Sequence, residues 1–197
     1  MTRRVAAALA ALTVALFLSS CSNSSDDHAD HPGTDQPVIT GQPAGYNADD
    51  VAFATNMIPH HQQAVELSAM VPDRSTNAEL VALAQQISAA QQPEINVMKV
   101  FLVQWNENPD NNSGHAGHGN AMQGMVDQAT MTKLESLNGQ EFDKLWLESM
   151  ISHHQGAIEM AKAEIANGDN MDAKSLAKNI VTTQEAEIGQ MKQMLGG

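Results

Sequence analysis

The sequence has almost no cysteine and few aromatic residues. Among its 197 residues, Cys21 is the single cysteine, and Phe, Trp and Tyr together make up 4%. One cysteine excludes an intramolecular disulfide, and its place ahead of the folded part excludes a thiolate metal site or a cysteine nucleophile there. The domain must therefore be stabilised by packing, with Leu, Ile, Val, Ala and Met filling its core.

Basic residues are also scarce. The chain has 10 Lys and Arg against 23 Asp and Glu, a formal net charge of -13 at pH 7. Removal of a leader that contains Arg3 and Arg4 leaves eight basic residues and a net charge near -15. Because such a surface repels a phosphate backbone, we do not expect nucleic acid as a partner.

No hydrophobic run reaches the length of a typical transmembrane helix. The longest covers residues 5–18, about 14 residues against the roughly 20 that a bilayer requires. It follows Arg3 and Arg4 and ends at Leu18-Ser19-Ser20-Cys21, an order that is typical of a secretory signal and resembles the bacterial lipobox. We predict a lipoprotein signal peptide at 1–20, lipidation of Cys21 and an anchor in the bacterial cell membrane, outside the cytoplasm. A plain secreted protein is the alternative.

The stretch at 21–46 is rich in Ser, Asp, Gly and Pro and has almost nothing apolar to bury. We therefore expect a disordered tether there. The remaining residues, 47–197, are long enough for one domain with a core of its own.

This domain contains an internal duplication. The sequence MIPHHQQAVE at 57–66 returns as MISHHQGAIE at 150–159, and the offset of 93 holds without a gap from 57–102 to 150–195. Of these 46 aligned positions, 17 are identical, mostly in two clusters. Each repeat, at about 50–105 and 140–195, is therefore expected to form a pair of helices.

Apolar residues at three- and four-residue steps predict an all-α fold. We expect helices at about 47–70, 76–105, 132–137, 140–166 and 171–195. Pro72 is expected to end the first of these and Pro93 to bend the second, while capping boxes are expected to begin at Thr76 and Thr132. Short loops and amphipathic stripes favour an antiparallel four-helix bundle of two tandem helix pairs, with a connecting loop at 106–131.

The repeated histidines are expected to face the core. On a helix, Met57, His60 and His61 lie on the same side as the neighbouring apolar residues, and the second repeat places its counterparts in the same way: Met150, His153 and His154. Buried imidazoles need partners, and a metal ion is one such partner. Satisfied core histidines are the alternative.

The second helix of each repeat places polar and thioether side chains on its apolar stripe. These are Glu94 and Met98 in the first repeat and Glu187 and Met191 in the second. Glutamate that faces histidine can ligate a metal or fix the imidazole tautomer. Imidazole together with thioether favours copper, although zinc and iron remain open. The methionines can also be flexible core filler.

A further candidate site lies between the repeats, where glycines flank histidines and methionines: His115, His118, Met122 and Met125. Together with the doubled M-I-x-H-H-Q-x-A-x-E phrase, the sequence Met122-Gln-Gly-Met125 resembles the domain of unknown function 305 family over about residues 47–195. This resemblance implies a ferritin-like helical bundle, export from bacterial cells and, for some members, copper binding or resistance. The residues it implies are the four repeated histidines with Met57, Met150, Met122 and Met125.

Three functions follow from these observations. The leading one is a lipid-anchored protein that binds or buffers copper without catalysis. The second is a metal-free module that binds another envelope protein. The third is a ferritin-like redox enzyme, but no glutamate stands three residues before a histidine, as the Glu-x-x-His motif of di-iron bundles requires. This difference argues against the enzyme, which stays the third alternative. The sequence does not determine the oligomeric state.

Overall fold

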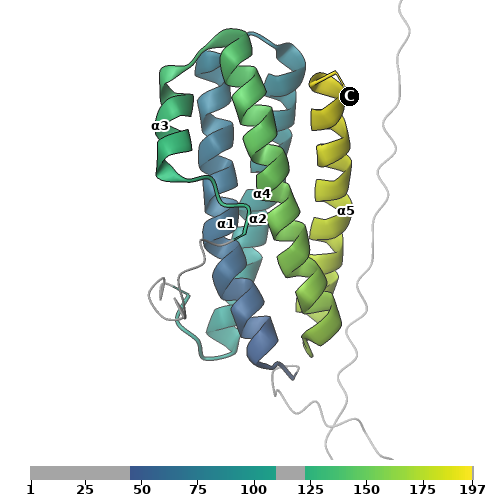
Figure 1. Ribbon diagram of the computed structural model, residues 1–197. Coiled ribbons are helices and arrows are strands. Elements are labelled where there is room, and N and C mark those ends of the chain that lie inside the picture. The colour runs from purple at the N-terminus through teal and green to yellow at the C-terminus, as the bar shows by residue number, and fades with distance from the viewer. Residues whose placement is uncertain (1–44, 110–122, 197) are drawn as a thin grey trace, which may run out of the picture. The chain divides into compact units, whose positions relative to one another are not determined.

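The computed structural model describes residues 45–109 and 123–196, and these residues form an all-α fold with five helices and no strand. Four helices are long and one is short (Figure 1). Their bounds are α1 Ala48–Arg74, α2 Ala78–Gln104, α3 Gln128–Ser136, α4 Gly139–Asn167 and α5 Met171–Met194. None of these helices is long and apolar enough to cross a membrane.

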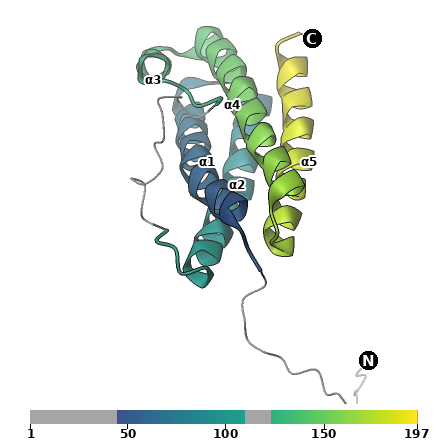
Figure 2. The same ribbon diagram turned by 60° about the horizontal axis from the view of Figure 1, so that its bottom comes forward.

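The four long helices form two hairpins that pack side by side. Residues 75–77 join α1 to α2 and residues 168–170 join α4 to α5, so the helices of each hairpin run in opposite directions (Figure 1). The hairpins meet through α1 against α4 and through α2 against α5. Each long helix therefore packs against its own counterpart in the other repeat. The short α3 lies beside α1 and α4 (Figures 1 and 2).

Asparagine and aspartate side chains cap α1, α2, α3 and α5, which corrects two of the predicted starts. Asn77 caps α2 and Asn170 caps α5, each accepting hydrogen bonds from two backbone N–H groups. The Asp127 side chain accepts a hydrogen bond from the Thr130 N–H and caps α3. That helix begins at Gln128, four residues before the predicted Thr132. The start at Thr76 is likewise wrong. Asx side chains reach the free N–H groups of a first turn directly, and the sequence has one next to Thr76, at Asn77, and one five residues before Thr132, at Asp127.

Pro72 does not end α1, contrary to the prediction. The helix continues through this exposed residue to Arg74. Proline removes one N–H and crowds the carbonyl four residues back, but two residues from the end of a helix it affects few hydrogen bonds. The bend predicted at Pro93, which lies inside α2, stays a prediction.

The core consists of two apolar clusters, one toward each end of the helices. One cluster contains Leu67, Phe142 and Trp146, and the indole Nε1 of Trp146 donates a 2.8 Å hydrogen bond to the Leu67 carbonyl. The other contains Phe53 and Trp105. Along both α1 and α4, the repeated histidines lie between the residues of the two clusters. The interior thus has a polar layer at mid-height.

The remaining predictions for the ends of the chain and for the connecting loop are not tested by this structure. The signal peptide, Cys21 and all of the tether except residues 45 and 46 lie outside the described residues. The same holds for His115, His118 and Met122, whereas Met125 is described and half-buried.

Candidate metal centre

The predicted site residues of the two repeats lie inside the helical core. All four histidines and all four methionines are buried, as is Glu187, whereas the Glu94 side chain is 19% exposed. The buried set is Met57, His60, His61, Met98, Met150, His153, His154, Glu187 and Met191.

His60 and His153 meet at the centre of this layer. Their ring centroids lie 3.7 Å apart with an angle of 40° between the ring planes. His153 is also the repeat counterpart of His60, since the two positions differ by 93. Because a residue that contacts its own counterpart lies on the symmetry axis of a paired structure, the histidine stack marks a pseudo-two-fold axis between the repeats.

Each outer histidine is paired with a glutamate from the second helix of its own repeat. His61 Nε2 lies 2.8 Å from Glu94 Oε2, and His154 Nε2 lies 2.8 Å from Glu187 Oε2. Such a carboxylate fixes the orientation of an imidazole and leaves its other nitrogen free to bind. The two pairs differ in the burial of the glutamate, and Gln86 of α2 also donates a 3.4 Å hydrogen bond to Glu187 Oε1.

Many polar atoms in this layer have no hydrogen-bond partner among the described residues. Both ring nitrogens of His60 and of His153 are unpartnered, as are Nδ1 of His61 and Nδ1 of His154. The buried amide Gln91 is also unpartnered, and so is the Oε1 atom of its counterpart, Gln184. Buried polar groups are normally satisfied, and each exception calls for a bound water, an ion or a functional role.

Burial keeps the two central histidines neutral. It lowers the pKa of His60 to about 3, and the neighbouring His61 acts in the same direction, while the Gln123 carbonyl near the ring opposes them. Burial and the adjacent His60 hold the pKa of His153 well below its usual range. A neutral imidazole carries a free lone pair, which is the form that binds a metal.

Thioether sulfurs flank the histidine layer on both sides. Met57 and Met98 belong to one apolar cluster, and Met150 and Met191 belong to the other. All four are fully buried. Within residues 45–109 and 123–196, however, no three His, Cys, Asp or Glu side chains converge as a ready metal cage. The side chains buried in and beside this layer offer imidazole nitrogen and thioether sulfur, a combination that suits softer Cu(I).

Sequence reasoning missed two residues that border the centre. Gln63 and Gly156 occupy equivalent positions of the two repeats and contact the segment Gln123–Val126. The available signal was the change from a long amide side chain to none at this position, one of three positions at which the histidine phrases differ.

Comparison with solved structures identifies relatives over most of the domain. A DUF305 protein from Streptomyces coelicolor is 34% identical, with a TM-score of 0.69, over 75% of this chain and 91% of that one. A DUF305 fragment from Deinococcus radiodurans is 30% identical, with a TM-score of 0.67, over 78% of this chain and 98% of that one. CopM in its Cu(II)-bound form is 33% identical, with a TM-score of 0.65, over 74% and 94%.

A search of curated proteins finds no match. The family model described as Domain of unknown function (DUF305) matches residues 50–195. These bounds include both helix hairpins except the first two residues of α1, together with the connecting segment and every predicted site residue except Cys21. The chain therefore belongs to the DUF305 family.

Proposed function

We propose that this protein is an exported copper-binding protein, which buffers copper or confers copper tolerance through its histidine and methionine residues. Copper is its cargo, and no catalysis is required. Its domain is a ferritin-like four-helix bundle of two tandem helix pairs at 47–197. A signal peptide at 1–20, a lipid anchor at Cys21 and a tether at 21–46 would hold this domain outside the cytoplasmic membrane.

The observation that carries this proposal is the pair of neutral histidines without partners. The four ring nitrogens of His60 and His153 lie in a buried layer, and none makes a hydrogen bond of full geometry to a described residue, although the backbone of Gln123 lies near the His60 ring and the backbone of His60 lies near the His153 ring. Leaving such groups unsatisfied costs about 1–3 kcal/mol each. A bound cation would recover this cost, and the carboxylates of Glu94 and Glu187 would balance its charge.

The donor set decides between metals. Nitrogen from His60, His61, His153 and His154 combines here with sulfur from the four buried methionines. Hard ions such as Mg²⁺ and Ca²⁺ prefer oxygen ligands, whereas Cu(I) accepts both imidazole and thioether. Zinc and iron use imidazole but gain little from thioethers, so copper is favoured over both.

The relatives support the same choice. CopM, which is 32% identical over 74% of this chain, has been solved in a Cu(I)-bound form, and related structures of it contain Cu(II) or silver. Silver(I) and Cu(I) are both soft monovalent ions, so a site that accepts both is consistent with sulfur and imidazole ligands.

The test is elemental analysis and titration of residues 22–197 with Cu(I) and Cu(II). A variant with His60, His61, His153 and His154 changed to alanine is compared with one that carries changes only at His115, His118, Met122 and Met125. Tight copper that is lost in the first variant and kept in the second would support the proposed centre.

Two other outcomes would contradict the proposal. Copper retained by the histidine variant would move the site to the connecting segment. No copper in the parent protein would favour the metal-free interaction module. A milder variant, His60→Leu with His153→Leu, covers the case in which four alanines prevent folding, and circular dichroism at 222 nm checks the helix content of each protein.

A further inference from the structure

The two repeats differ at a position that lies next to the histidine stack. Gln63 follows His60 by three residues, and Gly156 follows His153 by three residues, so both occupy the same place in their repeats. One residue has a long amide side chain and the other has none. In the structure both contact one segment, Gln123–Val126, Gln63 from α1 and Gly156 from α4, and we name this segment the strap.

Gln63 holds the strap from α1 by two hydrogen bonds. Its side-chain Nε2 donates to the Val126 carbonyl, and its Oε1 accepts from the Val126 backbone N–H, each at 2.8 Å. A side-chain amide that bonds both polar groups of one residue fixes that residue in position and orientation. Val126 thus has no freedom to shift along α1 while both bonds persist.

Gly156 holds the strap from α4 by leaving room for it. This glycine is buried, and a Cβ at its position would overlap the Gln123 carbonyl. Gly124 lies against the same turn with φ +87°, and a Cβ there would stand 2.6 Å from the Ser152 carbonyl oxygen. The backbone of the strap therefore rests directly on the backbone of α4, which only glycine permits on both surfaces.

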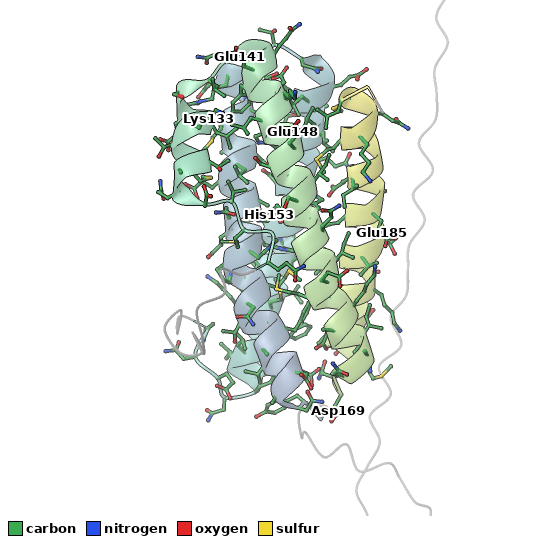
Figure 3. All side chains as sticks on the ribbon, viewed as in Figure 1. Lys133, Glu141, Glu148, His153, Asp169 and Glu185 are labelled. Carbon is green, nitrogen blue, oxygen red and sulfur yellow. The ribbon has the colours of Figure 1, made fainter. Side chains whose placement is uncertain are left out.

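The strap lies against the histidine stack. The Gln123 carbonyl is close enough to the His60 ring to favour its protonated form, although no ring nitrogen of His60 makes a geometrically complete hydrogen bond. His60 and His153 are 0% and 1% exposed. In Figure 3, His153 is labelled on α4 near the level at which this segment crosses. An ion that approaches along the seam between α1 and α4 would meet the strap first.

We propose that Gln63 and Gly156 are positioning residues that form a two-sided seat for the strap, and that release of the strap controls exchange of copper between solvent and the histidine stack. The role in copper exchange rests on the proposed function. The closed seat over the stack does not, because it follows from contacts of the metal-free protein.

The first experiment needs no metal. Gly156→Ala and Gln63→Ala each remove one side of the seat, and Gly189→Ala and Gln62→Ala are matched controls. Gly189 is an exposed helical glycine with nothing within 4 Å of an added Cβ, and Gln62 is exposed. Amide hydrogen exchange at Val126 is measured. Loss of two hydrogen bonds should speed this exchange roughly thirtyfold in Gln63→Ala, with no change in the controls.

The second measurement follows the accessibility of His60 and His153. Metal-free proteins are treated with diethyl pyrocarbonate, and mass spectrometry follows modification of His60 and His153. We expect at least tenfold faster modification in the two seat variants. Equal rates in seat variants and controls would overturn the closed seat. Because general unfolding would also expose histidine, the melting temperature and the amide exchange of the α2 interior must remain at parent values, and Gln63→Ala is the milder variant if Gly156→Ala unfolds.

The third measurement concerns copper exchange. Cu(I)-loaded protein is mixed with an excess of a chromogenic Cu(I) chelator, and the rate constant of release is recorded. Seat variants should release copper about tenfold faster than parent and controls. Faster histidine modification with unchanged release would overturn the role in exchange. A parent that binds no copper would refute the proposed function, while the first two measurements would still decide the seat.

Discussion

Replacement of Glu164 by glutamine should stabilise the protein at alkaline pH. Glu164 lies near the end of α4 and is 1% exposed, and within the described part of the chain no backbone N–H group donates to its carboxyl oxygens. Its polar neighbour is the buried carboxylate of Asp50, which accepts hydrogen bonds from the backbone N–H groups of Asn47, Asp169 and Asn170. Two carboxyl groups therefore share one end of the helical core.

The pKa values of the two carboxyl groups are shifted in opposite directions. Burial opposes ionisation of Asp50, but its backbone hydrogen bonds lower its pKa below the usual value of 3.8. Burial, the hydrogen-bonding contact with Asp50 and its negative charge raise the pKa of Glu164 from 4.5 to about 8, against an opposing effect of Lys174. At neutral pH, Glu164 thus keeps its proton in the folded protein.

The sign of the effect follows from proton binding. Well below pH 4.5 the Glu164 carboxyl group is protonated in both the folded and the unfolded protein and has no pH-dependent effect on stability. Between pH 4.5 and 8 the unfolded chain loses this proton and the folded protein keeps it, so the free energy of unfolding falls as pH rises. A shift from 4.5 to about 8 corresponds to at most about 5 kcal/mol, which is reached above pH 8.

The assay is thermal and urea unfolding of residues 22–197 at pH 5, 6.5 and 8, followed by circular dichroism. Glu164→Gln keeps the shape but cannot ionise, so its melting temperature should match that of the parent near pH 5 and exceed it by roughly ten degrees at pH 8. Glu159→Gln removes an exposed carboxyl group of the same helix and serves as the control. Parallel pH profiles for parent and Glu164→Gln would refute the reasoning.

Three further predictions concern the polar layer and the core around it. Trp146→Phe removes the hydrogen bond to the Leu67 carbonyl and should lower the free energy of unfolding by about 1–3 kcal/mol in urea titrations; a loss below 0.5 kcal/mol would contradict this. Glu187→Ala should destabilise the metal-free protein more than Glu94→Ala, because Glu94 is the more exposed of the two; equal losses in the same titrations would show that burial is not the cause. Copper at about 100 times its dissociation constant should raise the free energy of unfolding by about 2.7 kcal/mol, and a chelator should reverse this rise; an unchanged melting temperature would count against copper binding by the folded state.

Helix content and pairing could be predicted because they depend on patterns that repeat along the chain. The two hairpins and their short connections follow from apolar periodicity and from the offset of 93 residues. The errors lie where local chemistry has more than one solution. Asn77 and Asn170 are identical in the two repeats and cap equivalent helices, so the duplication itself contained the information that the threonine-based boundary at Thr76 overlooked.

The candidate site was predictable in part for a similar reason. The orientation of the histidines follows from helical geometry, and the glutamate partners follow from their place on the facing stripe. Contacts between distant segments left no such periodic signal. The pairing of Asp50 with Glu164 and the support of the strap by Gln63 both join residues more than 60 positions apart, and neither is part of a pattern within one helix.

The stack of His60 on its own counterpart bears on the origin of the chain. Two separate copies of a single helix pair, associated as a homodimer, would form the same stack across their interface. Gene fusion would then have preserved the interface and freed the two halves to diverge. A strictly symmetric dimer has the same residue type at the positions of Gln63 and Gly156. It could not bind one crossing segment through a side-chain amide from one half and a glycine backbone from the other. Contact of one segment with both Gln63 and Gly156 therefore requires two halves that differ in sequence, which a single chain allows.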